Sequence, residues 1–514
     1  MVAFITPEQA ADLVADGDTL VTSSFIVHVL PEALLQAVGK RFEKTGSPGN
    51  LTVVHVAGAG GGDERGLNYL AKEGLLKRVI AGHWNMTRQV GKLALEEKIE
   101  AYNFPQGVLS HLFRDIAAGK IGTLTHVGLM TFVDPRLDGG KINSSAKEDL
   151  VEVVHVGGRE LLLYKSFPVN VCFLRGTYAD ERGNVTLQHE GATLEVQAIA
   201  QATKNSGGKV IVQVDAVVQA GSLDPRLVLI PGIYVDAIVT VSEEERATAC
   251  KEHRAWFCGD ARVPASSFTP MLMDERKIIA RRAAIELRSD IVVNLGIGMP
   301  EGVAQVANEE GIGDYMTMVV EAGAVGGIPQ GGLLFGLAAN PEAILQQNAQ
   351  FDFFDGGGID LAFLGLAETD AEGNINVSKL GGRVTGAGGF INITQNAKQL
   401  VYCGTFTAKG LKIQTGDGKL AILNEGTQKK FLKQVGHVTF SGRYARQVGQ
   451  SVLYVTERAV FRLREDGMHL VEIAPGVDLE KDILALMDFV PIMETPPKLM
   501  DERIFMTKPM GLAQ

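Results

Sequence analysis

The chain alternates between short apolar runs and segments whose apolar residues recur at helical spacing. Runs such as "DIVVNLGIG" (290–298), "GGKVIVQVD" (207–215) and "KQLVYCGTF" (398–406) predict buried strands, whereas "KIIARRAAIELR" (277–288) has the spacing of a helix. Strands that alternate with helices are typical of open, mostly parallel α/β sheets. Ligands bind such sheets at the carboxyl ends of the strands. Chemistry is therefore expected in the residues that follow each strand.

One of these predicted strands ends in an isolated acid. In "TMVVEAGAVGGIPQGG" (317–332), β-forming residues run into Glu321, and small residues and glycines follow. We expect Glu321 to lie at the carboxyl end of its strand, facing a glycine-rich turn. The alternative is an ordinary exposed acid at a strand terminus.

The sequence also repeats itself, which makes this acid more informative. Three pairs of segments recur in the same order: "LPEALLQAV" (30–38) and "MPEGVAQVA" (299–307), "LTVVHVAGAGGG" (51–62) and "MTMVVEAGAVGG" (316–327), "CFLRGTYADERGNVTL" (172–187) and "AFLGLAETDAEGNINV" (362–377). The repeats predict two related α/β domains, residues 1–260 and 271–514, joined within the charged and then Pro/Ser-rich segment 242–270. The alignment places Val56 opposite Glu321. A duplicated scaffold in which one copy carries the chemistry explains that difference.

A glycine turn precedes the acid and allows a second interpretation. "GIGMPEG" (296–302) lies between a predicted strand and a predicted helix, where backbone N–H groups attract phosphate. A dinucleotide site requires G-x-G-x-x-G and an acid about 20 residues later, which Glu321 approximates. However, the third glycine comes one residue late, and a carboxylate would repel a pyrophosphate. An NAD-dependent dehydrogenase therefore stays an alternative, as does a tight turn without a ligand.

Composition narrows the functional classes. The 514 residues include 46% hydrophobic and 21% charged residues, an ordinary globular balance, and the formal net charge of −11 argues against nucleic acid as a partner. The four cysteines, Cys172, Cys250, Cys258 and Cys403, form no CxxC pair, and the histidines lie singly, so we expect no metal site. Neither a leader nor a membrane span is apparent, which predicts a cytoplasmic protein.

Long stretches of the chain resemble the class I CoA-transferases, in particular the propionate and acetate CoA-transferases. The stretches are "KIEAYNFPQGVLSHLFR" (98–114), "FPVNVCFLRGTYADERGN" (167–184), "GSLDPRLVLIPGIYVD" (221–236), "VVEAGAVGGIPQGG" (319–332), "FDFFDGGGIDLAFLGLAE" (351–368), "GNINVSKLGG" (373–382) and "PKLMDERIF" (497–505). The resemblance implies that the two halves correspond to α-like and β-like domains fused in one chain.

The resemblance also implies a reaction and a set of site residues. Glu321 would be the covalent nucleophile of a ping-pong reaction through a glutamyl-CoA thioester, and Gln106 would assist it. The positions implied to contact CoA are Gly296, Ile297, Gly298, Met299, Pro300, Gly388, Gly389 and Lys409. Coenzyme A enters as a substrate, with no permanently bound cofactor, and the family implies a homodimer or homotetramer.

The sequence does not identify the acyl group that the enzyme prefers. The partners implied are short-chain acyl-CoA and carboxylic acids, without a choice among acetate, propionate, butyrate and lactate. The segment "SSFIVHVLPEA" (23–33) carries bulky residues where relatives often have smaller ones, so acyl preference depends on whether this loop borders the pocket. A non-catalytic acyl-CoA sensor is the remaining alternative.

Overall fold

The computed structural model describes residues 2–242, 255–264 and 271–513. Most of the segment expected to join the two halves, and Cys250, lie outside these residues. The proposed boundary between residues 260 and 271 therefore stays a prediction. No helix within the described ranges is long and apolar enough to cross a membrane.

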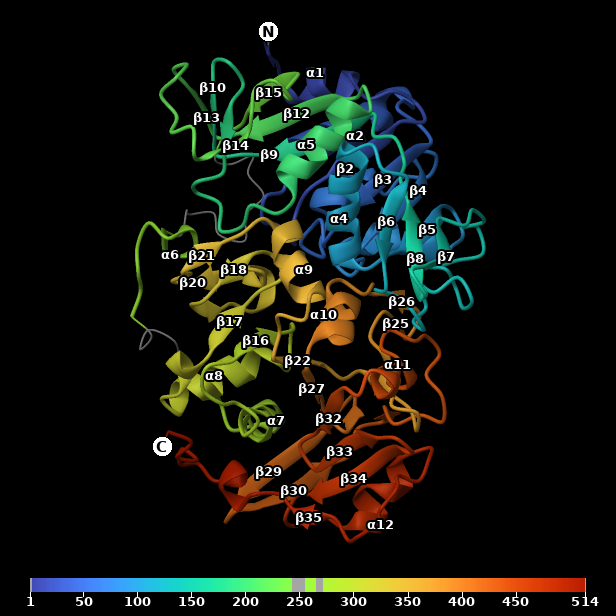
Figure 1. Ribbon diagram of the computed structural model, residues 1–514, viewed down its shortest axis with the longest axis vertical. Helices are drawn as coiled ribbons and strands as arrows, with labels where there is room; N and C mark the ends of the chain where they lie inside the picture. Colours follow the sequence, from blue (N-terminus) through green and yellow to red (C-terminus); the bar gives the residue numbers. More distant parts are fainter. Residues whose placement is uncertain (1, 243–254, 265–270, 514) are drawn as a thin grey trace.

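The first half is built on one fully parallel sheet of eight strands (Figure 1). In spatial order the strands are β1 (Ala3–Phe4), β15 (Ala237–Thr240), β12 (Lys209–Val214), β9 (Val171–Arg175), β2 (Thr19–Thr22), β3 (Leu51–His55), β4 (Leu76–Ala81) and β5 (Glu100–Asn103). The accompanying helices are α1 (Pro7–Asp12), α2 (Glu32–Thr45), α3 (Arg88–Leu95), α4 (Gln106–Ala117) and α5 (Val196–Asn205). Two small sheets complete this half: β6 (Gly122–Thr125), β8 (Arg159–Lys165) and β7 (Val151–Val156); and β13 (Ala216–Val218), β10 (Tyr178–Asp180), β11 (Val185–Thr186) and β14 (Val228–Ile230).

The second half contains a ten-stranded mixed sheet. Its order is β21 (Ala343–Ile344), β18 (Ala324–Val325), β17 (Thr317–Val319), β16 (Val292–Leu295), β22 (Leu361–Gly365), β27 (Gln399–Cys403), β32 (Ser451–Val455), β33 (Ala459–Arg464), β34 (Gly467–Ile473) and β35 (Lys498–Leu499). Its main helices are α7 (Glu275–Ala284), α8 (Glu301–Glu309), α9 (Gln347–Asp355) and α10 (Phe390–Asn396). The central strands β17, β16, β22, β27 and β32 are parallel, and antiparallel strands extend the sheet on both sides.

The two sheets share one topology, as the sequence repeats predict. The order β3-β2-β9-β12-β15 of the first half matches β17-β16-β22-β27-β32 of the second. The third repeat folds in the same register in both copies, because Tyr178 pairs with Thr186 and Glu368 pairs with Asn376. In each copy an Asp, Asp180 or Asp370, accepts hydrogen bonds from the Gly-Asn turn that follows.

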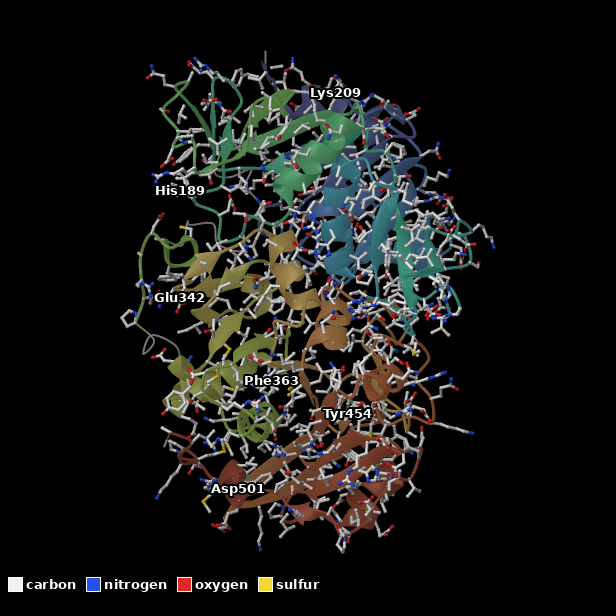
Figure 2. The ribbon with its side chains drawn as sticks, viewed as in Figure 1. His189, Lys209, Glu342, Phe363, Tyr454 and Asp501 are labelled. Atoms are coloured by element: carbon white, nitrogen blue, oxygen red, sulfur yellow. The ribbon has the colours of Figure 1, made fainter. Side chains whose placement is uncertain are left out.

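Parallel strands that are covered on both faces appear in the sequence as continuous apolar runs, so they are easy to predict. Phe363 on β22 and Tyr454 on β32, labelled in Figure 2, are fully buried. The halves meet where α4 of the first half packs against α9 and α10 of the second. At Gly107 a Cβ would lie 2.5 Å from side-chain atoms of Phe351 and Asn392, so glycine permits this close approach.

Candidate active site

Glu321 occupies the tip of a tight turn directly after β17. The Gly323 N–H donates to the Val320 carbonyl, and the Val320 N–H donates to the Ala324 carbonyl, both at 2.9 Å. Gly323 has φ +121°, and a Cβ there would lie 2.1 Å from the Leu345 carbonyl oxygen. The expected glycine turn is therefore present, but the chain returns as the antiparallel strand β18 instead of continuing into a helix.

The backbone around Glu321 is fixed by two buried amide side chains. Asn294 Nδ2 donates to the Val319 carbonyl at 3.0 Å, and Gln350 Nε2 donates to the Val320 carbonyl at 3.1 Å. Both side chains are fully buried. Together they fix the backbone of the turn. The carboxylate is therefore positioned by the carboxyl end of the sheet and not by a mobile loop.

The Glu321 side chain is buried, and one of its carboxylate oxygens has no hydrogen-bond partner among the described residues. It is 7% exposed, and its Oε2 makes no hydrogen bond with any described residue. Burial penalises the charged form and raises the pKa of Glu321 to about 7. The carboxyl group is thus not the exposed strand-terminus acid that the sequence left as an alternative. A buried acid whose pKa is strongly raised by desolvation is a candidate functional residue.

Gln106 and the glycine pair Gly388–Gly389 come together across the interface between the halves. The Gln106 N–H donates to the Gly388 carbonyl at 2.9 Å, and the Gly388 N–H donates to the Gly82 carbonyl at 2.7 Å. A Cβ on Gly388 would lie 3.7 Å from Gln106 Oε1, and one on Gly389 would lie 3.5 Å from Glu321 Cδ. One turn thus brings the Gln106 amide and the Glu321 carboxylate close to each other.

The two glycines differ in whether their N–H groups are available as hydrogen-bond donors. The Gly388 N–H is already committed to Gly82, whereas the Gly389 N–H donates to no residue that the structure describes. The Nε2 of Gln106 is also buried without a partner in the described part of the chain. The Gly389 N–H and the Gln106 Nε2 are therefore available to a ligand, and the Gly388 N–H is not.

Asn103, which the sequence analysis missed, ties the two halves together beside this turn. This fully buried residue ends β5, and its Nδ2 donates to the carbonyls of Ala81 and Gly82, both at 2.7 Å. Its Oδ1 accepts from the Ala387 N–H at 2.9 Å. Its place three residues before Gln106 was the available signal.

A single cavity of about 180 Å³ contains these groups. Its walls include the predicted Glu321, Gln106, Gly296, Ile297, Gly388 and Gly389. The other wall residues are Phe25, Ile26, Ala57, Gly58, His83, Met86, Phe335, Leu364, Gly365, Val377, Thr385, Gly386, Ala387, Phe390 and Ile393. A cavity of about 150 Å³ holds a benzene molecule. This space therefore suits an acyl group and its thioester, and it is too small for a whole CoA.

Four predicted positions do not line this cavity. The Gly298 N–H is bonded to Glu301 Oε1, Met299 packs against the core, and Pro300 is the N-cap residue of α8. Lys409 is exposed in the turn after β28 (Thr407–Ala408). A contact between these residues and the remainder of a CoA molecule stays a prediction.

The segment of residues 23–33, which runs into the start of α2, borders the cavity through Phe25 and Ile26. Ile26 has φ +58°, a backbone conformation that is a genuine outlier for a β-branched residue. Such strain is found where the surrounding structure fixes a functional position. Of the bulky residues noted in this segment, Ile26 therefore helps to set the size of the pocket, together with Phe25.

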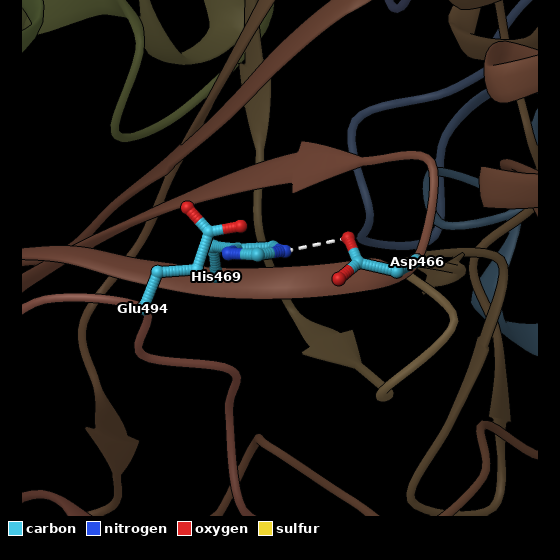
Figure 3. Close-up of side chains that lie close together, drawn as sticks. All are labelled: Asp466, His469 and Glu494. Carbon is cyan, nitrogen blue, oxygen red and sulfur yellow. Dashed lines mark hydrogen bonds and ion pairs between the residues drawn. The ribbon is translucent and has the colours of Figure 1, made fainter.

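One group of side chains elsewhere has the spacing of a metal site. Asp466, His469 and Glu494 present ligand atoms within 4.8 Å of one another (Figure 3), and none of them lines the cavity. His469 Nε2 lies 2.6 Å from Asp466 Oδ1, and Arg464 Nη1 pairs with Glu494 at 2.7 Å. Because each acid already has a partner, these pairs account for the cluster and no site is assigned to it.

Comparison with known proteins places the chain in a family. Residues 4–240 match the coenzyme A transferase family model. The chain is 46% identical over 519 residues to caffeate CoA-transferase of Acetobacterium woodii, covering 100% of this chain and 99% of the relative. It is 41% identical over 511 residues to acetate CoA-transferase YdiF of Escherichia coli K12, covering 99% and 96%.

A crystal structure of the acyl-CoA transferase YdiF apoenzyme from Escherichia coli O157:H7 superposes on the whole fold, with a TM-score of 0.94, 40% identity, and coverage of 99% of this chain and 97% of that one. The chain belongs to the coenzyme A transferase family and is a CoA-transferase. Within that family it is close to acetate CoA-transferase.

Proposed function

We propose that the protein is a short-chain acyl-CoA:carboxylate CoA-transferase of the propionate and acetate type, which works by a ping-pong mechanism through a glutamyl-CoA thioester on Glu321. The main observation behind this proposal is the buried Glu321 carboxylate, whose Oε2 has no hydrogen-bond partner among the described residues. It lies in a small apolar cavity beside the Gly389 N–H, which donates to none of those residues. A nucleophile needs this freedom, because a carboxylate held in an ion pair would be a weaker attacking group.

The reaction exchanges one thioester for another. A Glu321 oxygen attacks the carbonyl carbon of the acyl-CoA, the C–S bond breaks, and CoA leaves as a thiolate, giving a mixed anhydride. The thiolate then attacks the Glu321 carbonyl carbon, the anhydride C–O bond breaks, and the donor acid leaves. The resulting glutamyl-CoA thioester reacts with an acceptor acid through the same steps in reverse.

The cavity supplies what these steps require. Each attack places negative charge on a carbonyl oxygen, and a fixed donor such as the Gly389 N–H or the Gln106 amide contributes roughly 3 kcal/mol to stabilising it. Anhydride and thioester both hydrolyse in water, so a small apolar pocket helps to protect them. The volume of about 180 Å³ favours a short acyl group.

A related protein supports the covalent intermediate. A second crystal structure of YdiF, a thioester complex with CoA, matches the chain with a TM-score of 0.93 at 40% identity. A dehydrogenase has no comparable support, because the Gly296 N–H is bonded to the Phe363 carbonyl and Glu321 faces the small cavity. A cytoplasmic location and a homodimer or homotetramer stay predictions.

Intact mass spectrometry tests the proposal. With acetyl-CoA and no acceptor acid, the protein is expected to gain a CoA thioester that maps to the peptide containing Glu321. Borohydride is then expected to inactivate the enzyme by reducing this thioester. A label on a cysteine, or turnover without any label, would refute the mechanism.

A further inference from the structure

His83 lines the cavity with a buried Nδ1 atom and is a polar residue that the mechanism above does not use. It follows β4 in a loop that is held against the second half, because the N–H groups of Trp84 and Asn85 donate to the Thr385 carbonyl at 2.8 and 3.0 Å. A Cβ on Gly386 would lie 2.9 Å from His83 Cα. The position of the histidine is therefore fixed by both halves.

The imidazole ring has a defined orientation in the cavity wall. Its Nδ1 is buried without a partner among the described residues and lies 3.3 Å from where Gly58 would carry a Cβ. The opposite edge of the ring, at Cδ2, lies 3.6 Å from the point where Gly388 would carry a Cβ. Gln106 Oε1 lies 3.7 Å from the same point. Nε2 is bonded to Cδ2 and therefore adjoins this edge of the ring.

Burial also fixes the charge of this ring. It lowers the pKa of His83 to about 4, so the imidazole is neutral at neutral pH. A neutral imidazole can donate one hydrogen bond through Nε2 without giving up its proton. Such a donor stabilises an oxyanion and does not act as a general acid.

The mixed anhydride has two carbonyl groups, and the candidate donors lie at two positions of the cavity. The Gly389 position is next to Glu321 Cδ, whereas Gln106 and His83 meet at the Gly388 position. We propose that His83 Nε2–H, together with the Gln106 amide, binds the oxygen of the substrate's acyl carbonyl, while the Gly389 N–H serves the carbonyl of Glu321. This inference rests on the proposed function.

In each direction of the reaction, His83 acts in only one step. When the Glu321 oxygen attacks the acyl carbon, the carbonyl electron pair moves to the acyl oxygen, which accepts the hydrogen bond from His83. Collapse of this adduct breaks the C–S bond and releases the CoA thiolate. The later attack on the Glu321 carbonyl places its charge on the other oxygen, which His83 does not contact.

Two reactions of the thioester separate these steps. Formation of the glutamyl-CoA thioester from acetyl-CoA passes through the acyl-side oxyanion. Cleavage of the completed thioester by hydroxylamine attacks only the Glu321 carbonyl, forming a C–N bond and expelling CoA. We expect His83→Phe, which keeps a planar ring without a donor, to slow thioester formation roughly 100-fold, corresponding to one lost donor. Hydroxylamine cleavage should keep the wild-type rate.

Matched variants complete the test. His83→Gln restores a donor and should recover thioester formation to within roughly tenfold of the wild type, since an amide can also stabilise an oxyanion. His155→Ala removes an exposed histidine on β7, outside the cavity, and should leave both rates unchanged.

The outcomes that overturn the inference are distinct. An equal loss of both rates in His83→Phe would assign the histidine a structural role, and unchanged thioester formation would remove it from the reaction. A His83→Gln protein as slow as His83→Phe would exclude hydrogen bonding as the cause. Absence of the thioester in the wild-type protein would overturn the proposed function itself.

Discussion

Replacing the nucleophile should stabilise the protein at alkaline pH. Burial raises the pKa of Glu321 from 4.5 to about 7, so the folded state opposes ionisation of this group. At about 1.4 kcal/mol for each tenfold change in an equilibrium constant, the ionised carboxylate destabilises the fold by about 3 kcal/mol above pH 7. Glu321→Gln removes that charge and keeps the shape of the side chain.

The sign of the pH dependence follows from the raised pKa. Below pH 4.5 the carboxyl group is protonated in the folded and unfolded states, and no penalty exists. Between pH 4.5 and about 7 the unfolded chain loses its proton first, so wild-type stability falls as the pH rises. The advantage of Glu321→Gln should therefore be absent at pH 4.5, grow through this range and level off above pH 7.

Thermal unfolding at several pH values measures the effect. With an unfolding entropy of about 2.1 cal/mol/K per residue, 3 kcal/mol corresponds to a Tm increase of about 3 °C for the whole chain, or about 6 °C if the second half unfolds alone. The control is Glu64→Gln, because Glu64 is exposed and forms no hydrogen bond or ion pair within the described ranges. A Tm increase that is missing at pH 8.5, or is equally large at pH 4.5, would refute the reasoning.

Three further substitutions probe the geometry. Glu321→Asp shortens the attacking arm by about 1 Å and should slow transfer about 100-fold, measured by steady-state kinetics on folded protein; a normal rate would exclude Glu321 as the nucleophile. Gln106→Ala should lower kcat roughly 100-fold with little change in CoA affinity, because the amide acts in the transition state, and an unchanged kcat would make Gln106 structural. Gly323→Ala should reduce both thermal stability and activity, since its Cβ would lie 2.1 Å from the Leu345 carbonyl oxygen; wild-type values for both would show that the turn after β17 does not require glycine.

Much of the architecture could be predicted because it depends on local patterns. The apolar runs at β12, β16 and β27 are buried parallel strands, and the repeated segments marked two sheets of the same strand order. The antiparallel return after β17 could not be predicted, because Val56 and Glu321 are followed by nearly the same small residues in both copies. The direction in which each half continues after this strand depends on the strands that it packs against in the fold.

The candidate site was only partly predictable for a related reason. Glu321 stood out as a lone acid after an apolar run, but His83 and Asn103 carry no local motif. Their importance arises from hydrogen bonds and contacts with residues 385–388, which lie far away along the chain. Likewise, the choice between Gly388 and Gly389 as donors depends on a bond to Gly82 that the sequence does not reveal.

The shared topology explains how two similar halves can have different parts in one reaction. Val56, the counterpart of Glu321, is fully buried in the core of the first half, where β3 pairs with the parallel strand β4. In the second half the return to β18 places Glu321 in the cavity that Gln106, the first residue of α4, also lines. In our proposal the second half contributes the nucleophile and the Gly389 N–H, while the first contributes Gln106 and His83. Neither half alone would form the cavity for the acyl group, since residues of both halves line it.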